Sequence, residues 1–349
     1  MNGFMMLFSQ ILEQLRLAAE NVPGLTPLAD APFLFRPLVM VVLLGVVAGV
    51  IGVIINLRSA EFSAEALVHA VFPGIVAGAV YWGINAIIPA ASVVAVAAAL
   101  VLTLVSHRAR HNEASEAGTA VVLTSFFSIG LILSLAKGDM SGQLEALMFG
   151  RLLEVTDERL AQALIVCTVA LLLIMATWKE QVAYAFDRTG ARASGLRLLA
   201  LDLALNTAIA AAVVSASTAV GTLLVIGYLV IPGTTARILA SRVRSMVAVA
   251  IAVGVGGGYL GMLLMTLPET LDKPISPQAA VALVMTAILL LAVGVAAVRE
   301  RLRGAIQRAR STRSATVPTT SRNAGADSTA GRAVGSESAA APAAERSRV

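Results

Sequence analysis

Apolar runs that are each long enough to cross a bilayer follow one another from Pro37 to Val298. A spanning helix needs about 20 predominantly apolar residues. In hydrocarbon every backbone N–H and C=O must be bonded within the segment, so these runs predict helices. The expected spans are 37–57, 63–83, 86–105, 117–136, 160–178, 198–215, 219–236, 246–266 and 277–298. The predicted fold class is therefore all-α: a polytopic integral membrane protein with about 8–10 transmembrane helices.

The composition agrees with a chain that lies mostly inside a bilayer. Hydrophobic residues make up 58% of the 349 residues and charged residues 13%, and the mean hydropathy is +0.84. A soluble domain carries about 25% charged residues, so a soluble fold of this length could not hide so much apolar surface. The single cysteine, Cys167, excludes an internal disulfide and a cysteine-rich metal site.

Glycines recur at four-residue spacing inside several runs, for example Gly45 with Gly49 and Gly254 with Gly258. Such spacing allows the backbones of neighbouring helices to approach closely in a membrane. It predicts a packed helix bundle and indicates no particular function.

Basic residues orient the chain. They cluster after the third, fifth, seventh and ninth runs, whereas the intervening connections carry few. Basic loops stay in the cytoplasm, so the C-terminus is expected there, and nine spans would put the N-terminus outside. The expected parts are an N-terminal amphipathic, extracytoplasmic segment (1–35), a transmembrane domain (36–300) and a disordered basic cytoplasmic tail (301–349).

The second run opens with two ionisable residues, Glu65 and His69, that are four positions apart and so share one helix face. Ionisable groups inside a span are costly and tend to face a cavity or a partner. A carboxylate with an imidazole suits Zn²⁺ or Mn²⁺, although other ligands or water must complete the shell. The alternative is that Glu65 lies in interfacial water and His69 bonds a backbone carbonyl.

Two runs contain a Pro-Gly pair that should break or bend a helix. Pro73 and Gly74 follow His69 closely, and Pro232 with Gly233 lies near the cytoplasmic end of the run that carries Tyr228. Proline removes a helix donor and kinks the helix, and broken helices often line the path of a transported substrate. A kink that serves packing alone is the alternative.

The connection that contains Asp187, Ala191 and Gly195 is long enough for a short helix along the membrane surface. Its small residues would let another protein approach closely. An ordinary basic loop is the alternative.

These three segments together resemble the metal-type ABC permeases, the membrane subunits of bacterial zinc and manganese uptake systems. The second span of that family opens on Gly-Asp-x-x-x-His-Ala-x-x-x-Gly, and the stretch from Glu65 to Gly74 is similar, with glutamate in place of aspartate. The family's Gly-x-Leu-Leu, Ile-Pro and Thr-Ala-Arg elements match Gly221 through Arg237, and residues 116–135 and 144–156 are also similar. The resemblance covers residues 38–298 and leaves out both ends of the chain.

The resemblance implies the membrane-spanning permease subunit of an ABC importer for divalent metal ions in a bacterial cytoplasmic membrane. The sequence contains no Gly-Lys-Ser or Gly-Lys-Thr, hence no P-loop, so another chain would hydrolyse ATP. The implied partners are a cytoplasmic ABC ATPase, an extracytoplasmic metal-binding protein, a second permease in a homodimer or heterodimer, and membrane lipid. No nucleic acid is expected.

The resemblance also implies roles for particular residues. Glu65 and His69 would contact or gate the ion between the extracytoplasmic side and the middle of the membrane. The pathway and its kinks would involve Pro73, Gly74, Tyr228 and Pro232, and the loop that docks on the ATPase would involve Asp187, Ala191 and Gly195. No cofactor is expected to be bound permanently. Zn²⁺ is favoured as cargo, with Mn²⁺ and Fe²⁺ open. The choice stays open because the pair has one imidazole, which suits zinc, and one carboxylate, which suits manganese.

Other classes of protein make different demands on the sequence. A permease for a metal chelate, such as a siderophore or cobalamin, remains an alternative. A secondary transporter predicts internal repeats, and none is evident. An intramembrane enzyme would need a constellation such as His-Glu-x-x-His or Gly-x-Ser-x-Gly, which the sequence lacks, so the chain is expected to be no enzyme.

Overall fold

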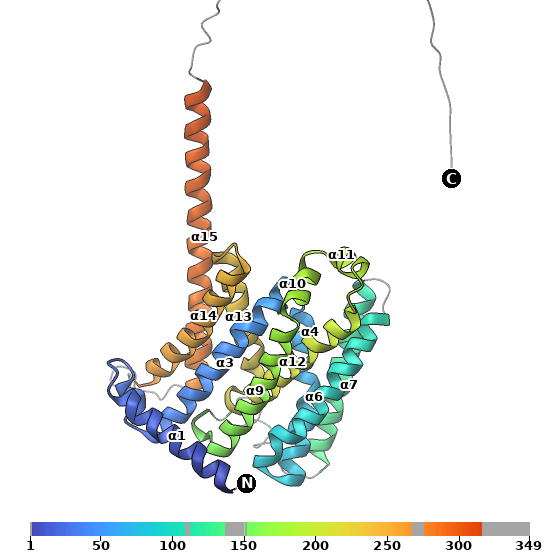
Figure 1. The fold of residues 1–349 in the computed structure, drawn as a ribbon, viewed down its shortest axis with the longest axis vertical. Coiled ribbons are helices and arrows are strands. Elements are labelled where there is room, and N and C mark those ends of the chain that lie inside the picture. The colour runs from blue at the N-terminus through green and yellow to red at the C-terminus, as the bar shows by residue number, and fades with distance from the viewer. Residues whose placement is uncertain (1, 109–111, 137–149, 151, 267–275, 316–349) are drawn as a thin grey trace, which may run out of the picture. The chain divides into compact units, whose positions relative to one another are not determined.

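The computed structural model describes residues 2–108, 112–136, 150, 152–266 and 276–315, which form helices and connecting turns without any strand (Figure 1). The helices are α1 (Asn2–Glu20), α2 (Thr26–Ala29), α3 (Pro32–Leu57), α4 (Glu61–Ala70), α5 (Phe72–Ala77), α6 (Ile87–Arg108), α7 (Asn112–Leu135), α9 (Asp157–Ala176), α10 (Trp178–Phe186), α11 (Arg188–Ala193), α12 (Leu198–Val220), α13 (Thr222–Leu239), α14 (Val243–Met265) and α15 (Pro277–Ala315). A π-helical turn (Gly78–Trp82) follows α5 directly.

Eight of the nine expected spans are confirmed. Within the described residues, eight helical segments are long and apolar enough to cross a membrane, and each coincides with one of the apolar runs. The remaining run, 219–236, corresponds to α13, whose apolar part, Leu224–Leu239, is shorter. The chain is thus an all-α polytopic membrane protein.

Helix α3 lies at the centre of the bundle, because it packs against α9, α12, α13 and α14. It has the highest mean hydropathy of the spans, 3.2, and 78% of the residues in its most apolar stretch are buried, compared with 17% for α15. A helix that is apolar all round is one that is buried all round. Side chains of α3, Ile51 and Ile54 among them, are fully buried in the main core.

Glycine lets α3 meet its neighbours at backbone distance. A Cβ atom at Gly45 would lie 2.6 Å from the backbone nitrogen of Val255 in α14, and one at Gly49 would lie 2.7 Å from that of Ile251. On another side, Gly52 faces the carbonyl of Leu229 in α13. These contacts confirm that the four-residue glycine spacing marks close helix packing.

Basic side chains gather where α3, α6 and α13 end and where α12 and α14 begin; we call this the basic end of the bundle. It includes Arg58, Arg108, Arg197, Arg237 and Arg242. Figure 1 shows α10 and α11 at this end and α1 at the opposite one. Charge is therefore distributed asymmetrically across the bundle.

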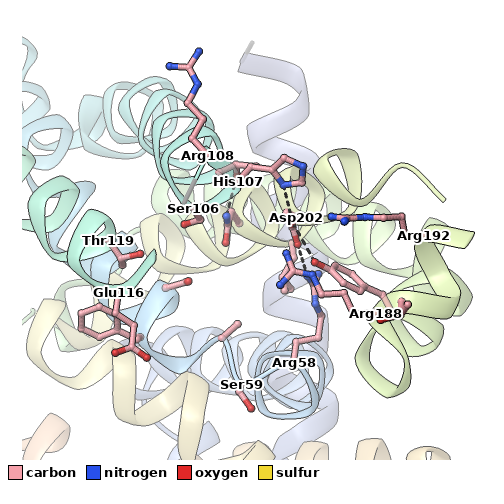
Figure 2. Close-up of a pocket in the computed structure, with 18 residues that line it drawn as sticks. Arg58, Ser59, Ser106, His107, Arg108, Glu116, Thr119, Arg188, Arg192 and Asp202 are labelled. Carbon is pink, nitrogen blue, oxygen red and sulfur yellow. Dashed lines mark hydrogen bonds and ion pairs between the residues drawn. The ribbon is translucent and has the colours of Figure 1, made fainter. Parts of the chain in front are cut away.

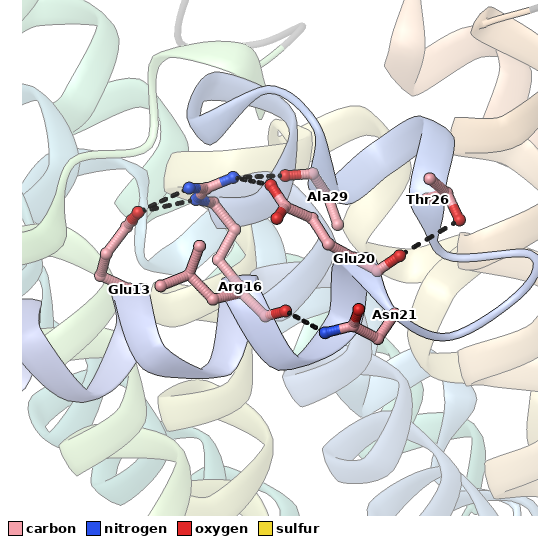
Figure 3. Close-up of polar contacts among 7 residues, drawn as sticks. Glu13, Arg16, Glu20, Asn21, Thr26 and Ala29 are labelled. Atoms are coloured by element: carbon pink, nitrogen blue, oxygen red, sulfur yellow. Dashed lines mark hydrogen bonds and ion pairs between the residues drawn. The ribbon is translucent and has the colours of Figure 1, made fainter.

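Helix α1 has one apolar face and one charged face, as expected for an amphipathic helix. Phe4, Leu7, Ile11 and Leu15 recur at helical spacing and are 48–57% exposed. Arg16 lies on the other face, where it bonds Glu13 and Glu20 and donates to the carbonyl of Ala29 at 2.9 Å (Figure 3). These bonds hold α1 to the segment that leads into α3, while the location of α1 outside the cell stays a prediction.

The C-terminal region departs in part from expectation. Regular structure was expected to end at residue 300, but α15 continues to Ala315. The added stretch contains alanine, arginine, leucine and glutamine, which have high helix propensity. Residues 316–349 lie outside the described residues.

The glycine contacts predict different outcomes for two glycines in the same helix. A Cβ at Gly254 would lie 2.7 Å from the carbonyl oxygen of Gly45, whereas one at Gly256 would meet nothing within 4 Å. We expect Gly254→Ala to destabilise the purified protein by about 1–3 kcal/mol, the usual effect of overpacking. Gly256→Ala is the matched control and should be neutral or stabilising by up to about 1 kcal/mol. Equal thermal stability of both variants in detergent would contradict the backbone contact.

Candidate functional site

Glu65 and His69 lie on the least covered face of α4. The other face is buried, since Ala64, Leu67 and Val68 are at most 1% exposed against α7, α12 and their neighbours. Glu65, in contrast, is exposed, and His69 is half-buried. The face that Glu65 and His69 share is predicted from their four-residue spacing. It is only partly covered by the other described helices, so it is accessible to solvent, lipid or a second chain.

His69 is held by a ring contact. Its imidazole meets the ring of Phe127 in α7 edge-on, with ring centroids 5.4 Å apart, and Phe127 also lies against Phe72 at 5.3 Å. Such aromatic pairs prefer offset or edge-to-face geometry. The contact restrains the imidazole beside the break between α4 and α5. Glu65 has no hydrogen bond to the described residues.

The pair is a partial metal shell. The described residues hold no group of three or more His, Cys, Asp or Glu side chains arranged to bind a metal ion. Zn²⁺ in proteins usually takes four ligands. In a site that keeps a position open, the protein supplies fewer than four, and water or substrate takes the remaining position. Glu65 and His69 could therefore hold a passing cation only together with water, backbone oxygen or groups of a second chain.

The helix break expected at Pro73 and Gly74 is confirmed. Helix α4 ends at Ala70, α5 begins at Phe72, and the span finishes in the π-helical turn. Pro73 has no N–H for the carbonyl four residues earlier, which is that of His69. A Cβ at Gly74 would lie 2.7 Å from the Cα of Ala91 in α6, so glycine is needed for the contact at the break.

At Pro232 the helix is not broken, and the expected bend there stays a prediction. Helix α13 continues from Thr222 to Leu239 with Pro232 inside it. The reason is its packing on α3, where Gly233 lies directly against the carbonyl of Gly52. Tyr228 is 1% exposed, and its hydroxyl lies 3.0 Å from the carbonyl oxygen of Val41 and 3.1 Å from that of Gly254. It joins α13 to α3 and α14, and its place in a pathway stays a prediction.

The loop around Asp187 contains the expected short helix, α11. The Asp187 carboxylate caps this helix by accepting a hydrogen bond from the N–H of Gly190 at 2.9 Å. Ala191 is 5% exposed in a small core with Tyr184, and Gly195, with a φ of +78°, ends the turn. The three residues lie at the basic end, on a segment separate from Glu65 and His69.

A polar cavity of about 870 Å³ opens at the basic end (Figure 2). Its lining comes from the ends of α3 and α6, from α10 and α11, and from the beginnings of α4, α7 and α12, and includes Arg58, Ser63, His107, Glu116, Arg188 and Asp202. Figure 2 shows Arg58 and His107 pointing toward Asp202. Sequence reasoning missed this cluster. The available signal was Asp202 itself, because it is the only charged residue in its apolar run.

Comparison with known proteins identifies the family. Residues 30–296 match the ABC 3 transport family. The chain belongs to this family. Helix α1 lies before the matched residues.

Two relatives of this ABC 3 family chain carry the names of metal transport systems. The manganese transport system membrane protein MntC of Listeria monocytogenes is 33% identical over 231 residues, which are 66% of this chain and 80% of that protein. The chelated iron transport system membrane protein YfeC of Yersinia pestis is 32% identical over 226 residues, which are 64% and 75% of the two chains. Among solved structures, PsaBC from Streptococcus pneumoniae in complex with Fab matches with a TM-score of 0.65 at 24% identity, over 77% of this chain and 94% of that one. At this identity the likeness concerns the fold alone.

Thiol labelling can distinguish whether the open face of α4 meets water or lipid. In a Cys167→Ser background, a charged methanethiosulfonate reagent should modify Glu65→Cys in liposomes, because only a hydrated thiol ionises and reacts. Ala66→Cys, at a position that is fully buried, should stay unmodified.

Val93→Cys is the matched control for lipid exposure, since Val93 in α6 is 73% exposed among apolar neighbours. It should react slowly, because a thiol in hydrocarbon stays protonated. Equal rates at positions 65 and 93 would contradict an aqueous face on α4.

Proposed function

We propose that this chain is the permease subunit of an ABC importer for a divalent transition metal, and that Glu65 and His69 contact the ion in transit. ATP would be hydrolysed by a separate cytoplasmic subunit, since the sequence has no P-loop. One observation carries the proposal. A carboxylate and an imidazole, one helical turn apart, lie on the least covered face of a broken span in an ABC 3 family chain.

The donors fit a transported ion rather than a resident one. Two side chains supply one oxygen and one nitrogen ligand, so most of the shell is left to water or to other groups. Weak, incomplete coordination permits release, which a transported ion needs at every site along its path. His69 is restrained by Phe127, so the nitrogen donor is positioned before an ion arrives.

Manganese is the first candidate for the cargo. The two relatives above are named for manganese and for chelated iron, and carboxylate oxygen suits Mn²⁺. These names lend no support to the zinc preference drawn from the sequence, and we propose Zn²⁺ only as a competing ion. Fe²⁺, bare or chelated, is the second candidate.

The remaining subunits follow from the same proposal. A second permease would cover the open face of α4, in a homodimer or a heterodimer. An extracytoplasmic metal-binding protein would deliver the ion, and α11 would dock on the ATPase. Basic loops stay in the cytoplasm, so the basic end would lie inside a bacterial cytoplasmic membrane, with the C-terminus also inside.

This orientation moves the proposed ion contact from where the sequence suggested it. Helix α4 begins at the basic end, and Glu65 lies only one turn from that beginning. At 1.5 Å per residue, the pair would lie in the inner half of the membrane. The ion would therefore meet Glu65 and His69 late in its passage, near release.

Metal uptake tests the proposal. In cells that lack their own manganese importer and express this chain with its ATPase and binding protein, Glu65→Ala and His69→Ala should each lower radiolabelled Mn²⁺ uptake at least about tenfold, as expected when a metal contact is lost. Glu65→Asp keeps the carboxylate and should retain most of the uptake. Competition by excess Zn²⁺, Fe²⁺ or a chelate identifies the preferred cargo.

Glu61→Gln is the matched control, because Glu61 lies in the first turn of the same helix and also carries a carboxylate. It should transport normally. Normal uptake by both alanine variants, at equal amounts of protein in the membrane, would remove Glu65 and His69 from the pathway. Uptake that persists without the ATPase would favour a secondary transporter.

A further inference from the structure

A partly buried polar cluster lies at the basic end, separate from Glu65 and His69. We call it the Asp202 cluster; it consists of Arg58, His107, Gln181, Tyr184 and Asp202. The Arg58 guanidinium donates to one carboxylate oxygen of Asp202. The Tyr184 hydroxyl donates to the other at 3.4 Å, and Nδ1 of His107 lies 3.7 Å from it. One carboxylate thus joins side chains from four elements.

Arg58 is the most constrained member of the cluster. Its side chain is 9% exposed, and it also donates to Oε1 of Gln181 at 2.7 Å. Its guanidinium carbon lies 3.9 Å from the centroid of the Tyr184 ring, a stacking geometry that favours a cation. Gln181 is fully buried and donates to the carbonyl of Leu201 at 2.8 Å. The charge is buried with its partners in place, which is the condition for tolerating it.

Tyr184 keeps its proton as a donor to this cluster. Burial, and next the charge of Asp202, raise the pKa of Tyr184 above its ordinary value. The hydroxyl therefore remains a donor throughout the physiological range. The ring thus contributes twice, through its face to Arg58 and through its hydroxyl to Asp202.

The cluster lies between two segments that the proposed function requires to move together. On one side, Gln181 and Tyr184 belong to α10, which continues through Asp187 into α11. On the other side, Arg58 ends α3 and is followed by Ser59, whose φ of +52° makes a tight turn into α4. Helix α4 carries Glu65 and His69. The cluster thus connects α10 by side-chain bonds to the C-terminal end of α3, from which Ser59 and Ala60 lead directly into α4.

We propose that Asp202 and Arg58 are positioning residues that transmit the movement of α10–α11 to α4, and so link ATP hydrolysis to ion movement. The inference rests on the proposed function, because it assumes that α11 docks on the ATPase. Coupling travels through packed networks that have discrete arrangements. A satisfied, partly buried network holds one geometry, and loss of Asp202 would leave the largely buried charge of Arg58 without its ion-pair partner. Breaking it should loosen α4 from α10–α11 while leaving the bundle core unchanged.

The test is the number of metal ions transported per ATP hydrolysed, measured with the complete transporter in liposomes loaded with a metal-sensitive dye. Asp202→Asn and Arg58→Gln should each lower this ratio at least fivefold while ATP hydrolysis continues. The double variant should be no worse than either single one, because both remove the same connection. Tyr184→Phe removes one hydroxyl, keeps the ring beneath Arg58 and should lower the ratio about twofold; it provides a test if the charge variants fail to fold.

Arg108→Ala is the matched control. Arg108 lines the same cavity and carries the same charge, but none of the hydrogen bonds or ion pairs among the described residues involves it. The Arg108→Ala variant should transport as many metal ions per ATP hydrolysed as the wild type. A wild-type ratio in the Asp202 and Arg58 variants overturns the inference. So does a parallel loss of transport and hydrolysis, since that indicates fewer active molecules rather than loss of the connection.

A second readout separates this inference from the proposed function. A wild-type transporter that hydrolyses ATP without moving metal would overturn the function. In that case the link between α10–α11 and α4 is tested by thiol labelling. The rate at which a charged thiol reagent labels Glu65→Cys, in a Cys167→Ser background, is measured with and without nucleotide. Nucleotide should change this rate, and Asp202→Asn should abolish the change. An unaltered response in Asp202→Asn overturns the inference whatever the cargo.

Discussion

The structure depends on the satisfaction of backbone polar groups within each helix, since hydrocarbon offers them no partner. Helices that satisfy themselves have little hydrophobic reason to associate in lipid, and close backbone contact must hold them together. Gly45, Gly49 and Gly52 provide this contact along α3, where side chains larger than hydrogen would collide with α14 and α13. The central position of α3 follows from these glycines together with its nearly uniform apolar surface.

The second span differs from the continuous, central helix α3. It is divided into α4, α5 and a π-helical turn, and one face of α4 is covered by the rest of the chain while the other, with Glu65, is open. Helix breaks in membranes are tolerated where the backbone is buried in protein or lines a watery passage. Close packing of Gly74 on α6 stabilises the break, so the irregular segment has a defined geometry beside the candidate ion contact.

Ionisable residues mark the two places where the bundle departs from simple packing. At the open face, Glu65 and His69 have no third His, Cys, Asp or Glu side chain beside them among the described residues. At the basic end, Arg58 and Asp202 satisfy one another and bring α3, α6, α10 and α12 together. The first arrangement is suited to a transient ligand and the second to a fixed connection. Both are expensive in a membrane protein, and this cost favours a functional role for each.

The spans, the short helix after Asp187 and the break at Pro73 could be predicted from the sequence, because apolar length, turn residues and proline act locally along the chain. The shared face of Glu65 and His69 follows in the same way from helical spacing. Other features depend on residues far apart in sequence. The helix continues through Pro232 because α3 packs beside it, Tyr228 finds carbonyls of Val41 and Gly254, and Arg58 meets Asp202 across 144 positions. Local chemistry determined which segments are helices and which face of α4 is polar, whereas only the tertiary structure decided which charges are paired and which remain open, because a charge finds its partner through the packing of distant helices.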